Sequence, residues 1–294
     1  MCRSNLETAI EMAKKDFVGY EVKEIEVVKA NDTVLKGICI TKPDTNVGAA
    51  LYLPEGADVK EWWQNARKNF HRALKESSVD KASTSVEEII SGDYVRKNVV
   101  PRLVSLAANK RYLTDKPYKT FLDMAIIYSV NVTELIGKEM ERADVVITKP
   151  LLEKIGMSVE ELDVCAMKNL VWETDKFDFW DMTVISNKSR LYGASCILSD
   201  KFLQQIREAK GGDFIILPSS VHECIVFDHM EDAADKADEL VEMVKSINST
   251  AVSPEEKLTD NAYVYADGKV TFLKDYLVGR AGRATDTQSA AESE

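Results

Sequence analysis

The chain has 294 residues, of which 45% are hydrophobic, so it can bury a substantial core as one large domain or two smaller ones. Its 38 Lys and Arg against 49 Asp and Glu give a formal net charge of −11, which disfavours nonspecific binding to nucleic acid or anionic lipid. No apolar run approaches the roughly 18 to 20 residues that span a bilayer, and the first residues lack the apolar stretch of a signal peptide. We therefore expect no membrane association and a cytoplasmic location.

The first quarter of the sequence predicts a helix, a three-stranded meander and a second helix. Ser4 with Glu7 has the spacing of a capping box and begins an amphipathic helix. Residues 22–29, 34–41 and 47–53 read as strands separated by turn residues. The helix after Asp58 carries its apolar residues at three- and four-residue spacing, Trp62 and Trp63 among them. We expect it to lie across the meander with both tryptophans in the core.

The middle of the chain predicts further strands and one long helix. Two apolar segments, 99–107 and 121–132, read as strands, although the first is also compatible with a helix. A helix over 159–170 follows, and then strands over 182–186 and 191–198.

The last third alternates helices with short strands. A helix begins at Asp200 and ends at the Gly211-Gly212 pair. Strands over 214–217 and 222–227 flank a bend at Pro218, and a helix with apolar residues between 237 and 247 follows. The pattern then predicts a capped turn at 253–256 and a hairpin of 261–265 with 269–273, joined by 266–268.

Strands and helices intermingle without the strict alternation of a doubly wound sheet. The predicted fold class is therefore α+β, with mixed or antiparallel sheets, a three-stranded N-terminal meander, packed amphipathic helices and a C-terminal hairpin. A polar interruption near residues 137–143 suggests an N-terminal α+β region, 1–140, and a C-terminal one, 141–279, although a single domain remains open. Residues 280–294 have too few apolar side chains for anchoring and are expected to be a disordered tail.

Three short motifs carry a family resemblance. They are Gly193-Ala194-Ser195-Cys196, then Leu217-Pro218-Ser219-Ser220-Val221-His222-Glu223, and then Leu258-Thr259-Asp260-Asn261-Ala262-Tyr263-Val264-Tyr265. With these, the chain resembles the bacterial domain-of-unknown-function family 5688 over nearly its whole length. The resemblance implies no activity, so the candidate chemistry has to come from the residues.

The second motif brings hydroxyl, imidazole and carboxylate groups together at Ser219, Ser220, His222 and Glu223. One interpretation is a hydrolase in which Ser220 attacks, His222 is the base and a carboxylate distant in sequence orients the imidazole. In an extended segment, Glu223 would point away from His222 and could not orient it directly. The alternative is a hydroxyl-capped turn, with His222 hydrogen-bonded to backbone or carboxylate groups, and this is the interpretation that we favour.

Metal and cofactor motifs are absent from the sequence. The three histidines, His71, His222 and His229, form no His-Glu-x-x-His motif, and no glycine-rich nucleotide loop is present. The five cysteines are widely spaced, as expected for reduced thiols. We expect neither a metal nor a cofactor.

Residues 96–119 are locally basic within an acidic protein. A basic strip beside aromatic residues can hold phosphates or stack bases, but most such strips are solvated or pair with acidic neighbours. Its cations are Arg96, Lys97, Arg102, Lys110, Arg111, Lys116 and Lys119, with Asp115 as the single acid and Tyr112 and Tyr118 between them.

The sequence therefore leaves three hypotheses. The preferred one is a non-catalytic module that binds a protein or an anionic ligand through Ser219, Ser220 and His222 and through the strip residues Arg96, Lys97, Arg102, Lys110 and Arg111. The alternatives are the Ser220/His222 hydrolase and nucleic-acid binding through residues 96–119.

Overall fold

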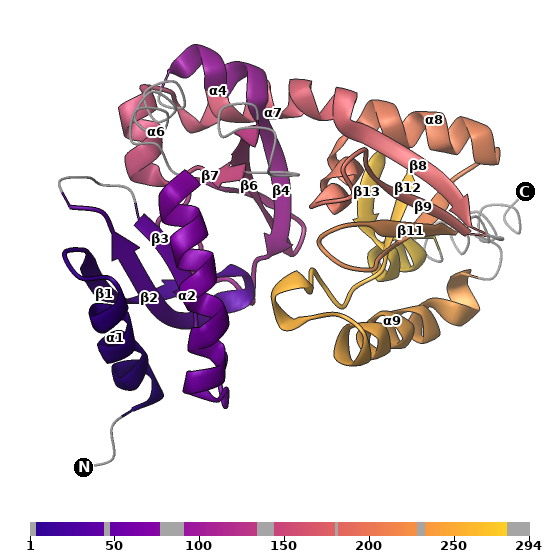
Figure 1. Cartoon of the computed structure of the whole chain (residues 1–294). Coiled ribbons are helices and arrows are strands. Elements are labelled where there is room, and N and C mark those ends of the chain that lie inside the picture. The colour runs from indigo at the N-terminus through magenta and orange to yellow at the C-terminus, as the bar shows by residue number, and fades with distance from the viewer. Residues whose placement is uncertain are drawn as a thin grey trace, which may run out of the picture.

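The computed structural model describes residues 4–43, 48–76, 91–133, 144–179, 182–227 and 233–280. Helices and antiparallel sheets intermingle over these residues, which confirms the predicted α+β class. Figure 1 shows three groups of elements that follow one another in sequence, each built on its own sheet. We call them the N-terminal group (4–76), the middle group (91–173) and the C-terminal group (174–280). No helix in the described ranges is both long and apolar enough to cross a membrane.

The N-terminal group is the predicted meander with its two helices. Trp63 and Phe70 of the second helix share a buried cluster with Ile38 and Ile40 of the central strand, so this helix lies across the meander as expected. Trp63 is buried, and Trp62 packs at the edge of the same cluster. The elements are α1 (Asn5–Asp16), β1 (Glu21–Val28), β2 (Val34–Thr41), β3 (Gly48–Tyr52) and α2 (Val59–Glu76).

The middle group is a small antiparallel sheet covered by helices. Its strands lie in the order β4, β6, β5, and β7 also pairs with β6. Residues 124–130 of β6 are all buried, because the strand is central in its sheet and covered on its faces. The elements are α4 (Gly92–Asn98), β4 (Val99–Ser105), β5 (Lys119–Phe121), β6 (Met124–Asn131), β7 (Asp144–Val146), α6 (Lys149–Ile155) and α7 (Val159–Glu173).

The C-terminal group has a six-stranded sheet in the order β13, β12, β10, β11, β9, β8. The predicted hairpin is β12 and β13, and its turn residues Asp267 and Gly268 both have positive φ, as a tight hairpin turn requires. A further helix covers 273–280. The other elements are β8 (Thr174–Phe179), β9 (Met182–Asn187), η2 (Gly193–Leu198), α8 (Asp200–Lys210), β10 (Phe214–Pro218), β11 (Cys224–Phe227), α9 (Ala233–Thr250), η3 (Pro254–Glu256), β12 (Tyr263–Ala266) and β13 (Lys269–Phe272).

The predicted strand over 191–198 is wrong. Residues 193–198 form the 3₁₀ helix η2, of which residues 193–197 are buried. A short apolar run indicates burial but does not by itself distinguish a strand from a tight helical turn. The strand predicted over 222–227 begins only at Cys224, because the residues before it form a turn.

The two-region division stays a prediction. Its proposed boundary, residues 137–143, lies outside the described residues, as does the predicted tail except for Arg280. The largest buried cluster includes residues from Val95 to Tyr265 and so draws on both sides of that boundary.

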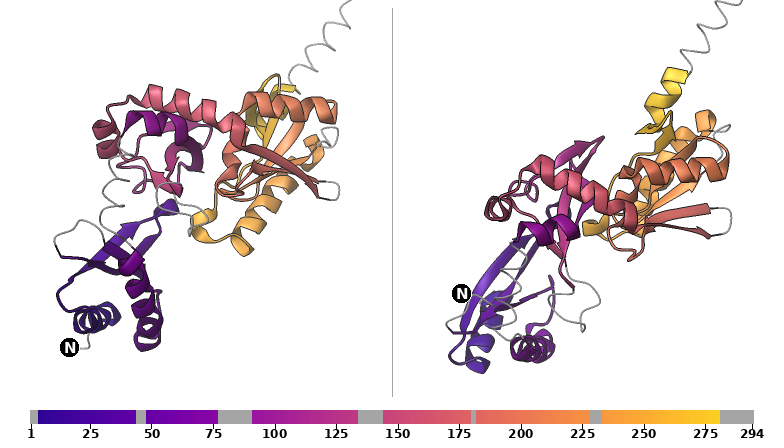
Figure 2. Two further views of the ribbon diagram at one scale, coloured as in Figure 1. Left: turned by 45° about the horizontal axis from the view of Figure 1, so that its top comes forward. Right: turned by 90° about the horizontal axis from the view of Figure 1, so that it is seen from above.

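The turn between β1 and β2 contacts both of the other groups, and Figure 2 (left) shows its tip beside them. Asn31, with φ 56°, donates its backbone N–H to Asn109 Oδ1 at 2.6 Å. Its side-chain amide donates to the carbonyl oxygens of Pro254 and Lys257, each at 2.7 Å. One asparagine therefore ties the meander to the middle group and to η3.

Candidate functional site

The Ser219–Glu223 segment is a closed turn. The backbone N–H groups of Ser219 and Ser220 both donate to the Glu223 carbonyl oxygen, at 3.1 and 3.4 Å. The Ser220 hydroxyl oxygen accepts from the backbone N–H of His222 at 3.0 Å. The alternation of side chains that an extended strand would give therefore does not apply here. The Ser220 hydroxyl caps the turn, and Glu223 contributes its backbone carbonyl.

Both ring nitrogens of His222 have partners. Nδ1 accepts from the backbone N–H of Tyr192 at 3.0 Å, so the proton of the neutral ring resides on Nε2. Nε2 lies 3.2 Å from Glu256 Oε1. The His222 carbonyl oxygen also accepts from the Ser186 hydroxyl at 2.8 Å. The Nδ1 lone pair that could take a proton from a hydroxyl is thus occupied by a backbone N–H.

Glu256 is the carboxylate beyond the imidazole. Its pKa is lowered chiefly by a hydrogen bond from the Ser253 side chain and further by His222, against the opposing effect of burial. Sequence reasoning did not identify this residue, because it lies 34 positions from His222 in a short 3₁₀ turn. The only signal was the predicted capped turn at 253–256, which gives no indication of a partner.

The first motif lies against the second. Tyr192 has a left-handed backbone, with φ 57°, and its ring centroid is 5.4 Å from that of His222. At Gly193, a Cβ atom would lie 2.5 Å from the Asn187 backbone nitrogen and 2.7 Å from the His222 carbonyl oxygen. Only glycine permits these backbones to approach so closely.

Tyr192 also connects the turn to a buried ion pair. The Arg102 guanidinium lies 3.8 Å from the Tyr192 ring centroid, and its Nη2 is 2.7 Å from Asp144 Oδ2. Both side chains of the pair are less than a tenth exposed. Removing one member of such a pair costs about 3–5 kcal/mol because the other charge stays buried. Arg102, predicted as a binding residue, is therefore a buried contact between the middle and C-terminal groups.

Three side chains of the third motif form hydrogen bonds with one carboxylate, that of Asp123. Thr259 and Asn261 donate to Asp123 Oδ2 at 2.5 and 2.9 Å, and the Tyr263 hydroxyl donates to Asp123 Oδ1. Burial and the adjacent Asp123 carboxylate raise the pKa of Tyr263, so its hydroxyl remains a donor. The motif thus joins the β5–β6 turn of the middle group to the sheet of the C-terminal group.

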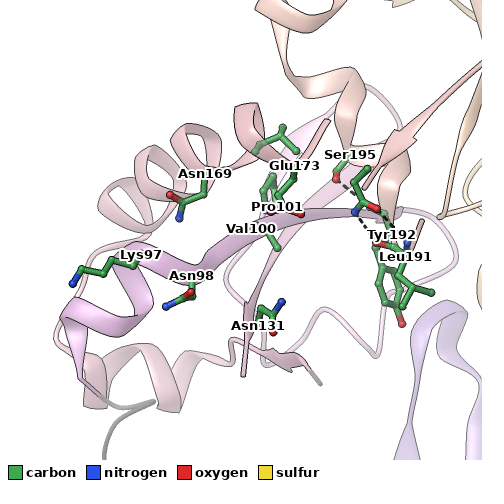
Figure 3. Close-up of a pocket in the computed structure, with 12 residues that line it drawn as sticks. Lys97, Asn98, Val100, Pro101, Asn131, Asn169, Glu173, Leu191, Tyr192 and Ser195 are labelled. Carbon is green, nitrogen blue, oxygen red and sulfur yellow. Dashed lines mark hydrogen bonds between the residues drawn. The ribbon is translucent and has the colours of Figure 1, made fainter. Parts of the chain in front are cut away.

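A cavity of about 170 Å³ lies where α4, β4 and α7 meet the segment 187–195 (Figure 3). Lys97 and Tyr192 stand at opposite ends in this view, with Val100 and Pro101 between them. Lys97 and Leu191 are exposed, whereas Ser195 is buried. The polar lining is Lys97, Glu173, Ser195 and the asparagines Asn98, Asn131, Asn169 and Asn187.

The profile of the Family of unknown function (DUF5688) matches residues 3–175 and 172–267, which is most of the chain. The chain belongs to this family. No curated protein and no solved structure matches it. In this DUF5688 member, the first motif contacts β4 and α7 of the middle group and the third binds Asp123 of the same group, whereas the second is hydrogen-bonded within the C-terminal group.

Most cations of the basic strip of this DUF5688 member have acidic partners. Arg96 pairs with Glu161 at 2.8 Å and Lys119 with Asp163 at 2.6 Å. The other pairs are Arg111 with Glu26 at 3.8 Å, Lys116 with Asp115 at 2.8 Å, and the buried Arg102 with Asp144. Of the five strip residues predicted to bind a ligand, Lys97 is the one in the cavity wall, and Lys110 lies outside that wall.

Within the described ranges, no group of three or more His, Cys, Asp or Glu side chains could hold a metal ion. The His71 ring packs 4.5 Å from the Phe17 ring. His229 lies outside the described residues.

Proposed function

We propose that this protein is a non-catalytic binding module that holds a small anionic ligand in the cavity beside Tyr192. The observation that carries the proposal is the cavity itself, whose wall includes one lysine, Lys97, and four asparagines. Its volume of about 170 Å³ is below the roughly 300–1,000 Å³ of pockets that hold drug-sized molecules, which favours a ligand of few heavy atoms. We place the protein and its ligand in the cytoplasm, because free thiols persist in a reducing compartment. The free cysteines are Cys39, Cys165, Cys196 and Cys224.

The motif residues support this role by fixing the cavity wall. Segment 187–195 is held by the bond from Tyr192 N–H to His222, and Asn187 binds both backbone polar groups of Leu191, at 2.8 and 3.2 Å. A wall fixed before the ligand arrives reduces the conformational entropy lost on binding. His222 thus supports the site as a positioning residue.

The same contacts argue against the hydrolase alternative. The Ser220 hydroxyl and both His222 nitrogens already have partners, and the bond to Nδ1 comes from a backbone group that a ligand cannot displace without moving the chain. Covalent labelling of Ser220 by a fluorophosphonate probe would contradict this part of the proposal.

Isothermal titration calorimetry with phosphate, acetate and succinate tests the proposal. We expect at least one of these anions to bind the full chain, and Lys97→Ala to weaken that binding by about tenfold or more, because a charge-assisted hydrogen bond is lost. Lys110→Ala is the matched control, since Lys110 belongs to the same basic strip but lies outside the cavity. The proposal fails if no anion binds, or if the two variants weaken binding equally, as a diffuse charge effect would.

A further inference from the structure

The hydrogen bond between Tyr192 and His222 depends on the protonation state of the imidazole. Nδ1 accepts from the backbone N–H of Tyr192 at 3.0 Å, which requires that this nitrogen carries no hydrogen. In the protonated ring both nitrogens carry a hydrogen, so no orientation of that ring offers an acceptor to Tyr192. Histidine is the side chain whose charge ordinarily changes between about pH 5 and 8. One added proton on His222 therefore removes the bond.

The other contact of the ring changes in the opposite sense. Nε2 lies 3.2 Å from Glu256 Oε1, and this contact becomes a charge-assisted pair when the ring is protonated. Glu256 is itself held in place, because its backbone carbonyl oxygen accepts from Val221 N–H at 2.8 Å. The protonated ring therefore stays with Glu256, and Tyr192 is the partner that is released.

Charged and titratable groups from other elements lie around the ring. Glu256, from η3, favours the charged ring, and Glu223 is a second acidic residue, next to His222 in its own turn. Arg102, from β4, lies 3.8 Å from the centroid of the Tyr192 ring, and its like charge opposes protonation. The Tyr192 and His222 ring centroids are 5.4 Å apart. Since the His222 side chain is 23% exposed, solvent can deliver the proton.

Tyr192 is held in an unfavourable backbone conformation. Its φ is 57°, and Arg190, two residues before it, has φ 55°. Residues other than glycine rarely adopt this left-handed conformation, which persists where surrounding contacts impose it. Leu191 and Tyr192 both line the cavity. Loss of the bond to His222 therefore lets the backbone relax and loosens the cavity wall.

We propose that His222 and Tyr192 form a pH-sensitive latch on the cavity wall, which is closed when His222 is neutral and open when it is protonated. The ligand then binds near neutral pH and is released in mildly acidic solution. The effect of the latch on ligand affinity rests on the proposed function, whereas the opening of the wall does not.

Amide hydrogen exchange of the full chain at about pH 7.5 and 5.5 tests the latch. The rates are corrected for intrinsic exchange at each pH, which gives the protection of each segment. We expect the protection of residues 188–195 to fall about tenfold or more between the two pH values, because this segment loses a hydrogen bond. Residues 263–266 of β12, which are all buried, should keep theirs. Equal protection of residues 188–195 at both pH values overturns the latch.

Two variants identify the group that titrates. His222→Asn keeps an acceptor oxygen near the Nδ1 position but does not titrate, so the protection of residues 188–195 should be the same at both pH values. Glu256→Gln keeps an acceptor for Nε2 but removes the charge that favours the protonated ring, so protection should be lost only at a lower pH than in the wild type.

Glu255→Gln is the matched control for the second variant. Glu255 is an exposed neighbour in the same 3₁₀ turn, and its variant should lose protection at the same pH as the wild type. If His222→Asn loses protection between the two pH values as the wild type does, another group titrates and the latch is wrong.

Calorimetric titration links the latch to the ligand. The probe is whichever of phosphate, acetate and succinate binds most tightly at about pH 7.5, titrated into the wild type and into His222→Asn at both pH values. The ratio of the two affinities cancels the titration of the anion itself. We expect the wild type to lose about tenfold relative to the variant at the lower pH.

The outcomes separate the latch from the proposed function. If no anion binds while residues 188–195 still lose protection, the proposed function fails and the latch stands. If an anion binds and the affinity ratio is the same at both pH values, the anion site stands and its regulation by the latch is wrong.

Discussion

Gly193 lies where two other backbone segments come closest to it. The nitrogen of Asn187 and the carbonyl oxygen of His222 occupy the space where a side chain would begin. One glycine therefore determines how near segment 187–195 can approach the Ser219–Glu223 turn, and hence whether Tyr192 N–H reaches the His222 ring. The first two motifs depend on each other through this contact.

Gly193→Ala should destabilise the fold by about 1–3 kcal/mol, because the new methyl group must displace backbone atoms. Gly212→Ala is the control, since a Cβ at Gly212 meets nothing within 4 Å. Urea unfolding of both variants measures the difference. Equal stability of the two variants would mean that segment 187–195 moves aside freely, which would contradict a fixed cavity wall.

Short connections between strands, more than the strands themselves, join the N-terminal group to the other two groups. The β1–β2 turn, the loop after β4 and the 3₁₀ helix η3 contact one another through Asn31, Asp32 and Asn109. In this junction the Asp32 carboxylate accepts from the backbone N–H groups of Arg111 and Tyr112, at 3.0 and 2.8 Å. It acts as a cap for a turn that belongs to a different group.

The Asp32 cap should make stability depend on pH. Burial acts to raise the pKa of Asp32, but the hydrogen bonds from the Arg111 and Tyr112 backbone and the Arg111 charge outweigh it and lower the pKa. A lowered folded-state pKa means that the ionised cap stabilises the fold fully above the ordinary value of about 3.9, and that this contribution disappears as the pH falls through the folded-state pKa.

Asp32→Ala should therefore lower the free energy of unfolding by about 1–2 kcal/mol at pH 7, and the difference from the wild type should narrow below about pH 4. Urea unfolding at pH 7, 5 and 3 measures it. Asp93→Ala, whose side chain is 88% exposed, should change stability little at any of these values. A difference at pH 3 as large as that at pH 7 would exclude the ionised cap as its source.

Regular elements were largely predictable from the sequence, because their apolar spacing reports burial directly. The meander, α1, α2, α7, α8 and the C-terminal hairpin follow from that spacing and from capping residues. The short helices α4 and α6 and the strand β8 were not predicted, since they carry too few apolar residues for a period to emerge. Residues 193–198 were predicted wrongly for the opposite reason. Their apolar run is unbroken, so it shows no period that would distinguish a 3₁₀ helix from a strand.

The candidate site was less predictable, because its contacts join residues distant in sequence. The second motif identified His222, but its partners Tyr192 and Glu256 are 30 and 34 positions away. The cavity draws residues from 97 to 195, and of these only Lys97 carried a signal, as part of a charge cluster whose other members turned out to be mostly paired.

At the scale of the whole molecule, the middle and C-terminal groups share one apolar cluster, whereas the N-terminal group has a cluster of its own and joins the others through polar contacts. Asn31 makes such contacts for the N-terminal group, and Asp123 and Tyr192 add polar contacts between the middle and C-terminal groups. Polar contacts need exact geometry, since an unsatisfied buried polar group costs about 1–3 kcal/mol. The arrangement of the groups should therefore be sensitive to single side chains.

Asn31→Gly tests this sensitivity while keeping the positive φ of the turn, which glycine adopts without strain. We expect amide hydrogen exchange in residues 105–116 and 253–257 to accelerate about tenfold or more, because the side-chain bonds that tie these segments together are lost. Asn69→Ala, on the exposed face of α2, should leave exchange in both segments unchanged. Unchanged exchange in Asn31→Gly would show that other contacts suffice to hold the groups.

The sequence separation between Asn31 and its partners also determines the order in which these contacts can form during synthesis. Its carbonyl partner at Pro254 is 223 residues further along the chain, so at roughly 5–20 residues per second the ribosome delivers it some 10 to 45 seconds later. The meander can complete its own core during that delay and its tip can bond to Asn109, but the bonds from Asn31 to Pro254 and Lys257 form only after the C-terminal segment emerges. A nascent chain that stalls before η3 would therefore carry a folded N-terminal group in which the side-chain amide of Asn31 still lacks its carbonyl partners. This is a stage at which a chaperone can engage the chain.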